Sequence, residues 1–427
     1  MRFVNSLLIA IFTASLLISP LFGEETKGPQ VGDKIEPFET TTIDGNTLKL
    51  EWYAGMPIII DMWATWCPPC KQELPALQEL AYEFPMEFFV LAVSIDPEKD
   101  KEIVQKFLEE NKIDMTVVHD ADHAILDKFP TDYIPSLTVI GKDGNVLKKF
   151  EGYDQDLIPQ LKELLGLKPP SSSKEYAERG YKLYDYMSNY EKALADFDKA
   201  IEMDPINSIA RCGRGEVLVD MGKKDEGIKD LLRAIELSNT NSRAYMNLGY
   251  LEEGARNYEK ALEWYTIGAE NSPEDERLVN YRDQLANKVE ILNTPAPDFT
   301  VKTLTGEEIT LSALKGNKAV IIDSWATWCG PCRLEMPKLQ EFYNKYSDKV
   351  EIIAVSNEKE LQTITDFIAK EGFTFKIVQD ADGVVKEKYP SKYIPFLTII
   401  SKDGLIIETF TGYNENVIEE LEGLLEL

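Results

Sequence analysis

Short apolar runs and helical periodicity alternate in two stretches of the chain. In the first stretch, residues 58–63, 88–93 and 136–140 are mainly apolar runs, which favours buried strands. From Cys70 onward, leucines return at the spacing of one helix face. Strands that alternate with amphipathic helices predict an α/β domain in which helices flank a sheet.

This pattern occurs twice. Residues 58–80 and 320–342 are identical at 15 of 23 positions. Shorter matches, such as a Tyr-Ile-Pro tripeptide and a Lys-Asp-Gly turn, continue downstream in both copies. The duplication therefore spans whole domains, and we place the two copies at residues 24–167 and 291–427.

A second, shorter repeat lies between the two copies. Three units of 34 residues follow one another, and small and aromatic residues recur within them. This period is typical of tetratricopeptide repeats, in which each unit is a pair of packed helices. The predicted units are 174–207, 208–241 and 242–275, and residues 276–289 form a helix that caps the last unit, so that the helical domain spans 174–290.

The first residues have the pattern of an export signal. Arg2 precedes an uncharged run over 3–22 that is rich in Leu and Ile, and acidic residues begin at Glu24. A charged start, an apolar stretch and small residues near its end are typical of a secretory signal, here residues 1–23. The run is also close to the ~20 apolar residues that span a bilayer, so an uncleaved anchor is the alternative. In both cases we expect an exported protein in a periplasmic or other extracytoplasmic compartment.

Composition and charge narrow the class of partner. The chain has 427 residues, of which 44% are hydrophobic and 28% charged, and these are the values of an ordinary globular protein. The formal net charge is −28, from 74 acidic and 46 basic side chains. A surplus of negative charge repels phosphate backbones and anionic lipid heads, so we expect no nucleic-acid partner.

Four of the five cysteines form two close pairs. Cys67 and Cys70 make one C-x-x-C pair, Cys329 and Cys332 make the other, and Cys212 stands alone. Two isolated pairs in an exported protein indicate redox chemistry. The first cysteine of each pair is placed at the start of a helix, where free backbone N–H groups stabilise a thiolate, and the second lies one turn inward. We therefore expect a nucleophile, a resolving thiol and a reversible disulfide in each pair.

Metal binding is the competing interpretation of the cysteines. A structural zinc site needs four ligands, usually from two neighbouring pairs, whereas these pairs are separated by the whole helical domain. The histidines His119 and His123 also have a spacing that suits a metal, but the second copy has Gln379 and Gly383 in their places. We therefore interpret the histidine segment as a surface loop and expect neither a metal nor a separate cofactor.

The motifs around the cysteines resemble a known family. The strings WCPPC at 66–70 and WCGPC at 328–332 look like thioredoxin-fold active sites. The longer strings WATWCPPCKQELP and WATWCGPCRLEMP resemble the exported TlpA/ResA group of thiol-disulfide oxidoreductases, which is classed with the redoxin and AhpC/TSA branch of the thioredoxin superfamily. The resemblance implies two α/β thioredoxin folds on either side of an all-α tetratricopeptide domain.

The resemblance also implies further site residues. The proline of each Tyr-Ile-Pro tripeptide matches one that is cis in this fold and faces the disulfide. The implied substrate-binding residues are Trp66, Ile134 and Pro135 in the first copy and Trp328, Ile394 and Pro395 in the second. The implied disulfides are Cys67–Cys70 and Cys329–Cys332.

Two acids in each copy are candidates for proton transfer. Glu73 and Glu335 match an active-site glutamate of the TlpA/ResA group, with a solvated helix glutamate as the alternative. Asp61 and Asp323 match the buried acid of thioredoxin itself, where many of the exported group have Asn. This departure leaves open which acid handles the proton.

The resemblance implies an exported disulfide reductase with two C-x-x-C sites that exchange dithiols for disulfides in protein substrates. Its electrons would come from another dithiol, and we expect this donor to be a membrane-embedded reductant. A thiol peroxidase of the AhpC/TSA type is one alternative, although neither copy has the Pro-x-x-x-Thr/Ser-x-x-Cys pattern of that activity. The other alternative is a scaffold whose tetratricopeptide repeats bind a protein partner.

Overall fold

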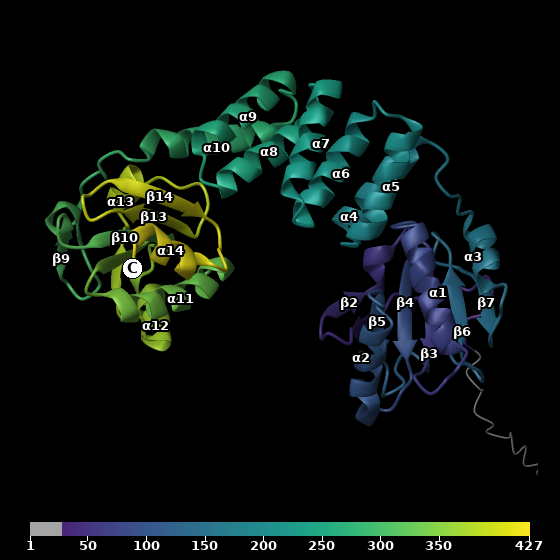
Figure 1. The fold of residues 1–427 in the computed structure, drawn as a ribbon. Helices are drawn as coiled ribbons and strands as arrows, with labels where there is room; N and C mark the ends of the chain where they lie inside the picture. Colours follow the sequence, from purple (N-terminus) through teal and green to yellow (C-terminus); the bar gives the residue numbers. More distant parts are fainter. Residues whose placement is uncertain (1–27) are drawn as a thin grey trace, which may run out of the picture. The chain divides into compact units, whose positions relative to one another are not determined.

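The computed structural model describes residues 28–427, so the predicted signal at 1–23 lies outside the described residues. The chain forms two compact units that meet in sequence between Leu237 and Ser238. Each unit contains one copy of the duplicated domain together with part of the helical region (Figure 1). Within residues 28–427, no helix is long and apolar enough to cross a membrane.

A five-stranded mixed sheet lies at the centre of the first domain, in the order β5-β4-β3-β6-β7. Strands β3, β4 and β5 run parallel to one another, β6 runs antiparallel to β3, and β7 runs antiparallel to β6. The strands are β3 Ile58–Trp63, β4 Phe89–Ser94, β5 Thr116–His119, β6 Ser136–Ile140 and β7 Val146–Glu151. A hairpin of β1 Glu39–Thr41 and β2 Thr47–Lys49 and a short 3-10 helix, Leu50–Tyr53, precede them.

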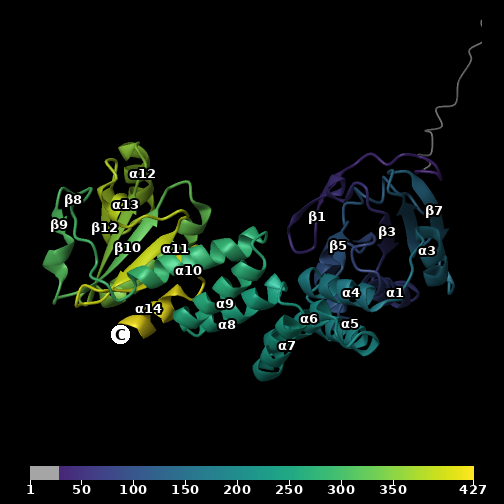
Figure 2. The ribbon, with the colours of Figure 1, turned by 90° about the horizontal axis from the view of Figure 1, so that it is seen from above.

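Alternation along β3 assigns its side chains to two faces of this sheet. Ile59 packs with α1 Cys70–Glu83 and α3 Leu157–Leu165, and α2 Lys101–Glu110 packs on the same face beside Trp63. Ile60 packs on the opposite face, against the hairpin and the segment after β5. Figure 2 shows α1 and α3 beside the strands of the N-terminal unit.

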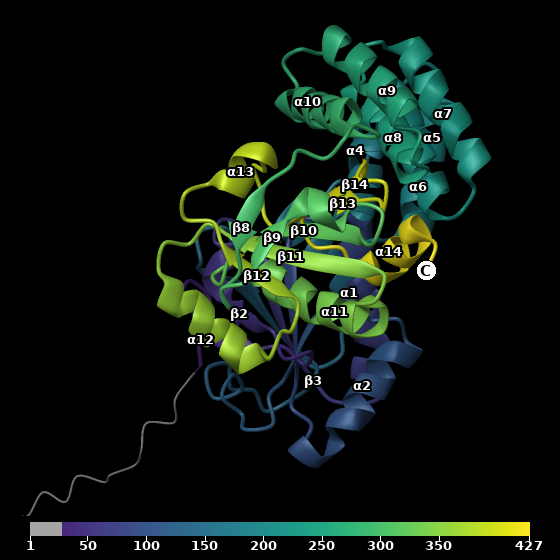
Figure 3. The same cartoon turned by 90° about the vertical axis from the view of Figure 1, so that its left-hand side faces the viewer.

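The second domain repeats this topology. Its sheet has the order β12-β11-β10-β13-β14 with the same mixture of parallel and antiparallel pairs. Helices α11, α12 and α14 pack on one face, and α13 and the hairpin β8/β9 pack on the other (Figure 3). The strands are β8 Thr300–Lys302, β9 Glu308–Thr310, β10 Ala319–Trp325, β11 Val350–Ser356, β12 Lys376–Gln379, β13 Phe396–Ile400 and β14 Ile406–Thr411. The helices are the 3-10 helix Leu311–Leu314, α11 Gly330–Tyr346, α12 Leu361–Glu371, α13 Val384–Lys388 and α14 Val417–Leu425. The predicted α/β fold is confirmed in both copies.

The helical region consists of helix pairs with the predicted period. The helices are α4 Ser173–Asp185, α5 Tyr190–Met203, α6 Ser208–Asp220 and α7 Lys224–Leu237 in the N-terminal unit, and α8 Ser242–Gly254, α9 Tyr258–Asn271 and α10 Glu276–Ile291 in the C-terminal unit. Glycine lets paired helices approach closely: a Cβ at Gly249 would lie 2.0 Å from the ring of Tyr265. Packing of this kind explains why small and aromatic residues recur in each unit.

In the N-terminal unit, α4 and α5 dock on the last turns of α1. The Arg179 guanidinium donates to the Glu83 carbonyl oxygen at 3.2 Å and pairs with Asp196 on α5. Lys192 pairs with Glu79 at 2.8 Å, and Tyr82 lies in one apolar cluster with α4 and α5. The docking surface is therefore the end of α1 that lies away from the cysteines.

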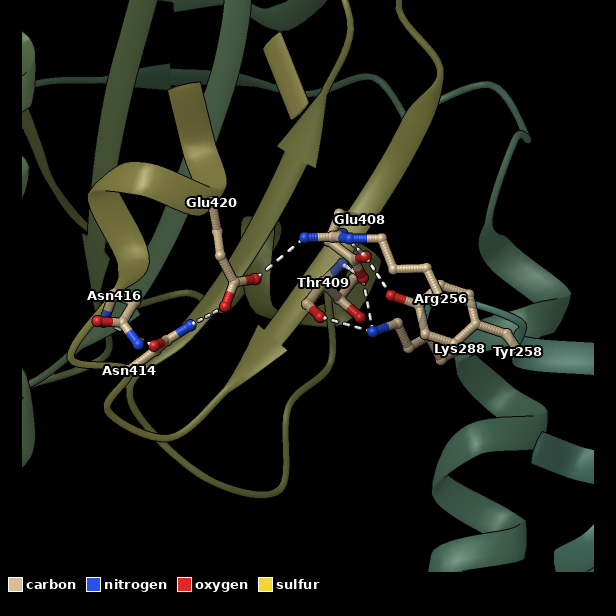
Figure 4. Close-up of polar contacts among 8 residues, drawn as sticks. All are labelled: Arg256, Tyr258, Lys288, Glu408, Thr409, Asn414, Asn416 and Glu420. Atoms are coloured by element: carbon tan, nitrogen blue, oxygen red, sulfur yellow. Dashed lines mark hydrogen bonds and ion pairs between the residues drawn. The ribbon is translucent and has the colours of Figure 1, made fainter. Parts of the chain in front are cut away.

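In the C-terminal unit, a buried carboxylate joins the helices to the second sheet (Figure 4). Glu408 on β14 is 1% exposed and accepts hydrogen bonds from Arg256 at 2.5 Å and from the hydroxyl of Tyr258. The Lys288 ammonium group on α10 lies 2.6 Å from the other carboxylate oxygen. The sequence reasoning missed this contact because Glu408 is in a strand pattern and its partners lie far upstream.

Candidate functional site

The first cysteine pair lies at the junction between the end of β3 and the start of α1. Cys67 and Cys70 are joined by a disulfide, and both are buried. The Cys70 backbone N–H points at Cys67 Sγ at 3.3 Å, and Cys67 Sγ also lies 3.7 Å from the Ile134 carbonyl oxygen. The loop before β6 therefore reaches the first sulfur of the pair.

The second pair has nearly the same geometry but a different helix start. Cys329 and Cys332 are joined by a disulfide, and the Cys332 N–H lies 3.2 Å from Cys329 Sγ. Cys329 is the N-cap of α11, which begins at Gly330, whereas α1 begins only at Cys70. The expected placement of the first cysteine at a helix N-terminus therefore describes Cys329 better than Cys67.

The loop opposite each disulfide contains the predicted cis proline. The Ile134–Pro135 and Ile394–Pro395 bonds are both cis. The Gly152 N–H donates to the Pro135 carbonyl oxygen at 2.8 Å, and an equivalent bond holds the second loop. Ile134 and Ile394 pack in the clusters that contain the cysteines. The tryptophans before the cysteines point outward, because Trp66 is 61% and Trp328 73% exposed.

Two buried acids accompany the first disulfide. Asp61 and Glu73 are 1% and 4% exposed, and neither Glu73 oxygen nor Asp61 Oδ1 has a hydrogen-bond partner within the described part of the chain. Burial raises the pKa of Asp61 and, together with the charges of Asp61 and Asp154, raises that of Glu73 well above its ordinary range. The alternative that Glu73 is a solvated helix residue is therefore wrong.

The second site repeats the acid pair. Asp323 is fully buried, Glu335 is 1% exposed, and all four carboxylate oxygens lack partners among the described residues. Burial raises the pKa of Asp323 to about 7, and burial and the charge of Asp323 raise that of Glu335 to about 8. Ala354 is the strand neighbour of Asp323 and brings no cation to it. Each disulfide therefore has carboxyl groups nearby that can hold or accept a proton near neutral pH.

A pocket whose walls include the sequence neighbours of Cys329 and Pro395 was not expected from the sequence. It has a volume of about 330 Å³, and its walls include Trp328 from the cysteine motif and Tyr393 and Ile394 from the cis-proline loop. Lys386 and Lys392 also line it. The signal that would have revealed these two lysines is the comparison of the copies, because the first copy has Leu126 and Asp132 at the matching positions.

The histidine segment differs from its prediction. His119 is the last residue of β5, its side chain is only 4% exposed, and its Nε2 lies 2.7 Å from the Asp96 carbonyl oxygen. His123 lies in an exposed turn with a positive φ of 62°. The interpretation as a surface loop is correct for His123 and wrong for His119, because a strand end carries the latter into the sheet. Cys212 is fully buried in α6, in agreement with a packing role.

Comparisons with known proteins identify the domains. The AhpC/TSA family matches residues 31–149 and again 292–409, which together are more than half of the chain. Tetratricopeptide repeats match residues 182–242 and 212–276 between them.

Individual relatives match one copy of the domain. Thiol-disulfide oxidoreductase ResA of Bacillus thuringiensis (strain Al Hakam) is 36% identical over 148 residues, which are 34% of this chain and 84% of the relative. Thioredoxin-like protein YneN of Bacillus subtilis (strain 168) is 36% identical over 139 residues, or 31% of this chain and 77% of the relative. The crystal structure of StoA from Bacillus subtilis has 32% identity and a TM-score of 0.28, and the match covers 31% of this chain and 98% of StoA. This chain therefore belongs to the AhpC/TSA family, of which it contains two domains separated by tetratricopeptide repeats.

Proposed function

We propose that this protein is an exported thiol-disulfide oxidoreductase that reduces disulfides in protein substrates at two sites. The observation that carries the proposal is the arrangement at each disulfide: a cysteine pair at a helix start, with a cis-proline loop opposite and unpartnered buried acids nearby. The 36% identity to a relative named thiol-disulfide oxidoreductase supports it. The cysteine pairs are the redox groups, and no other cofactor takes part.

The reaction starts from the reduced pair. The Cys67 or Cys329 thiolate attacks one sulfur of a substrate disulfide, so that a mixed disulfide forms and the substrate's other sulfur leaves as a thiolate, which takes up a proton. Cys70 or Cys332 then loses its proton and attacks the first cysteine. The second substrate thiol is released, and the enzyme is left with the disulfide that the structure contains. Two electrons pass from the cysteine pair to the substrate in each cycle.

The buried acids take the proton of the resolving cysteine. Glu335 and Asp323 lie on the same sheet face as Cys332, in a site from which bulk water is excluded by burial. A carboxylate whose pKa is raised toward 8 is a better proton acceptor for a thiol than an ordinary glutamate, because the two pKa values are closer. Glu73 and Asp61 have the same part in the first site.

The exposed residues around each disulfide bind the substrate chain. Trp66 and Trp328 offer apolar surface beside the first cysteine. The Ile134-Pro135 and Ile394-Pro395 segments offer backbone groups to an extended substrate, since the Ile134 carbonyl oxygen already reaches the disulfide. A membrane-embedded dithiol donor returns electrons to the pairs, and the signal at 1–23 delivers the chain to the extracytoplasmic side, where such a donor is accessible.

The test is reduction of insulin disulfides with dithiothreitol as the electron source. The wild-type protein accelerates the reaction, and Cys67→Ser combined with Cys329→Ser abolishes the acceleration, whereas Cys212→Ala retains it. Unchanged insulin reduction by the double variant contradicts the proposal. Consumption of hydrogen peroxide at a rate above that of insulin reduction supports a peroxidase instead.

A further inference from the structure

The walls of the pocket at the second site include residues that are next in sequence to Cys329 and to the cis proline. Trp328 directly precedes Cys329, and Ile394 directly precedes the cis proline, so two of its walls are the segments that flank the disulfide. Tyr389 forms a buried part of the lining. With a volume of about 330 Å³, the pocket has room for a substrate side chain next to the cysteine under attack.

Two ammonium groups in the pocket lining have no anionic partner within residues 28–427. Lys386 and Lys392 are exposed, and among residues 28–427 no hydrogen bond or ion pair engages either Nζ; that of Lys392 lies 5.6 Å from the centre of the Tyr393 ring. The lining carboxylate belongs to Glu358, and it is already engaged. It accepts hydrogen bonds from the Thr327 N–H at 2.7 Å, the Thr327 hydroxyl at 2.6 Å and the Ser356 hydroxyl at 3.1 Å.

The matched positions in the first copy have the opposite character. Leu126 of the first copy corresponds to Lys386 of the second, and Asp132 corresponds to Lys392. Ile95 corresponds to Asn357. Ile95 and Leu126 pack against the core cluster of the first sheet. The acid that corresponds to Glu358 is retained as Asp96, with the same bonds to Thr65 and Ser94. The first site therefore has two acids and no base at these positions, and the second has one acid and two bases.

From this difference we propose that the second site selects substrate segments that carry a carboxylate next to the disulfide cysteine. The carboxylate enters the pocket and pairs with Lys386 and Lys392, while the substrate backbone lies against Trp328 and Tyr393. The first site disfavours the same segments because Asp132 repels them. This inference rests on the proposed reductase function and adds the substrate class that distinguishes the two sites.

The size of the preference for a carboxylate-bearing substrate follows from the solvent exposure of the two lysines. Ion pairs at solvent-exposed positions are worth a few tenths to about 1 kcal/mol each, so two of them give about five- to tenfold selectivity at low salt. The preference decreases at high ionic strength, because charges that face water are screened. It acts on substrate capture and leaves the chemistry of the cysteines unchanged.

The experiment uses the full chain with one active pair. Cys67→Ser with Cys70→Ser leaves the second site, and its reduced form reacts in single turnover with two disulfide-linked peptides that differ only by Glu or Gln beside the cysteine. We expect the Glu peptide to react about five- to tenfold faster at low salt. Replacing the lysines by their first-copy counterparts, Lys386→Leu with Lys392→Asp, removes or reverses the ratio of the Glu-peptide rate to the Gln-peptide rate.

The control has the same change in charge at the other end of the sheet. Lys349 precedes β11 and Lys402 follows β13, so both lie opposite the strand ends that carry the disulfide. Lys349→Leu with Lys402→Asp keeps the preference if the pocket is responsible. Equal rates for the two peptides, or equal loss of preference in the control, overturn the inference while reductase activity stands. Failure to reduce either peptide contradicts the proposed function itself.

Discussion

Arg256 and Glu408 are 152 residues apart in the sequence, yet the Arg256 guanidinium donates a 2.5 Å hydrogen bond to the Glu408 carboxylate (Figure 4). The carboxylate is nearly inaccessible to water and has three further partners, Tyr258, Lys288 and the Thr409 backbone N–H. In the first copy the matching residue is Lys148, which instead donates to Gln160 on α3. The two α/β domains therefore contact the repeat helices through different surfaces, the end of α1 in the first and β14 in the second.

The first prediction concerns this contact. Lys288→Met leaves Glu408 with one positive partner fewer and should lower the free energy of unfolding by about 2–3 kcal/mol, because a buried carboxylate loses compensation. Hydrogen exchange of β14 in the full chain measures the effect. The control is Arg233→Ala, which breaks an exposed pair with Glu236 and should cost less than about 0.5 kcal/mol. Equal effects of the two variants contradict the prediction.

The second prediction concerns stability and pH. Asp323 and Glu335 have pKa values raised to about 7 and about 8, so they keep protons in the folded state that the unfolded chain has lost above pH ~4. Stability should therefore fall as pH rises from about 4 to about 8. Asp323→Asn removes one of these groups and should raise the stability at pH 8 by roughly 2–4 kcal/mol, with little effect at pH 4.

Calorimetry of the full chain at several pH values measures this change. The control is Asp382→Asn, since Asp382 is exposed in the turn after β12. A gain for Asp323→Asn that is the same at pH 4 and pH 8 speaks against a buried protonated acid.

The third prediction concerns proton transfer. Glu335→Gln keeps the shape of the side chain but removes the acceptor, so the resolving step slows by about 10²-fold and the mixed disulfide accumulates. In the wild type, the resolving rate rises through pH 8, where Glu335 ionises. Quenched-flow trapping of the mixed disulfide, with the first cysteine pair replaced by serine, measures the resolving rate of the variant and the pH dependence of the wild-type rate. An unchanged resolving rate in the Glu335→Gln variant would show that Asp323 or water accepts the proton of Cys332.

The fourth prediction is that the two sites differ in thiolate stability. Pro68 and Pro69 supply no backbone N–H beside Cys67, whereas Gly330 supplies one beside Cys329. Asp154 adds negative charge near the first site, and the second copy has Asn414 there. We expect a higher pKa for Cys67 than for Cys329, so that the second pair is the more oxidising and electrons pass from the first site toward it.

Thiolate absorbance titrations of full-length variants with one active pair measure this order. Pro68→Gly should lower the pKa of Cys67, and Gly330→Pro should raise that of Cys329. A lower pKa for Cys67 than for Cys329 in the unmodified sites reverses the expected direction.

The fifth prediction concerns helix packing in the last repeat. Gly249→Ala places a methyl group where the Tyr265 ring lies, which should cost about 1–3 kcal/mol through overpacking. Gly254→Ala in the same helix meets open space and should be neutral or slightly stabilising. Thermal unfolding compares the pair. Similar effects of the two substitutions show that helix propensity, and not the contact with Tyr265, decides the outcome.

Local pattern predicted the fold and the cysteines because both depend on neighbours in the sequence. The run before Cys67 is a strand and the leucines after Cys70 form a helix, so the disulfide had to lie at their junction. The burial of Glu73 was not predictable, because the sequence pattern around a helix glutamate does not show whether its side chain faces solvent or the sheet. The Glu408 contact and the lysine pocket were missed because their members are brought together only by tertiary structure.

Helix α1 has separate tasks at its two ends. Cys70 is its first residue, and Glu79, Tyr82 and Glu83 in its last turns hold the repeat helices. Fourteen residues at 1.5 Å per residue make α1 about 20 Å long. The contact with the repeat helices therefore lies almost a full helix length from Cys70. The first repeats are thus attached without covering the start of the helix, so the repeat helices can stay docked while a substrate reacts at the disulfide.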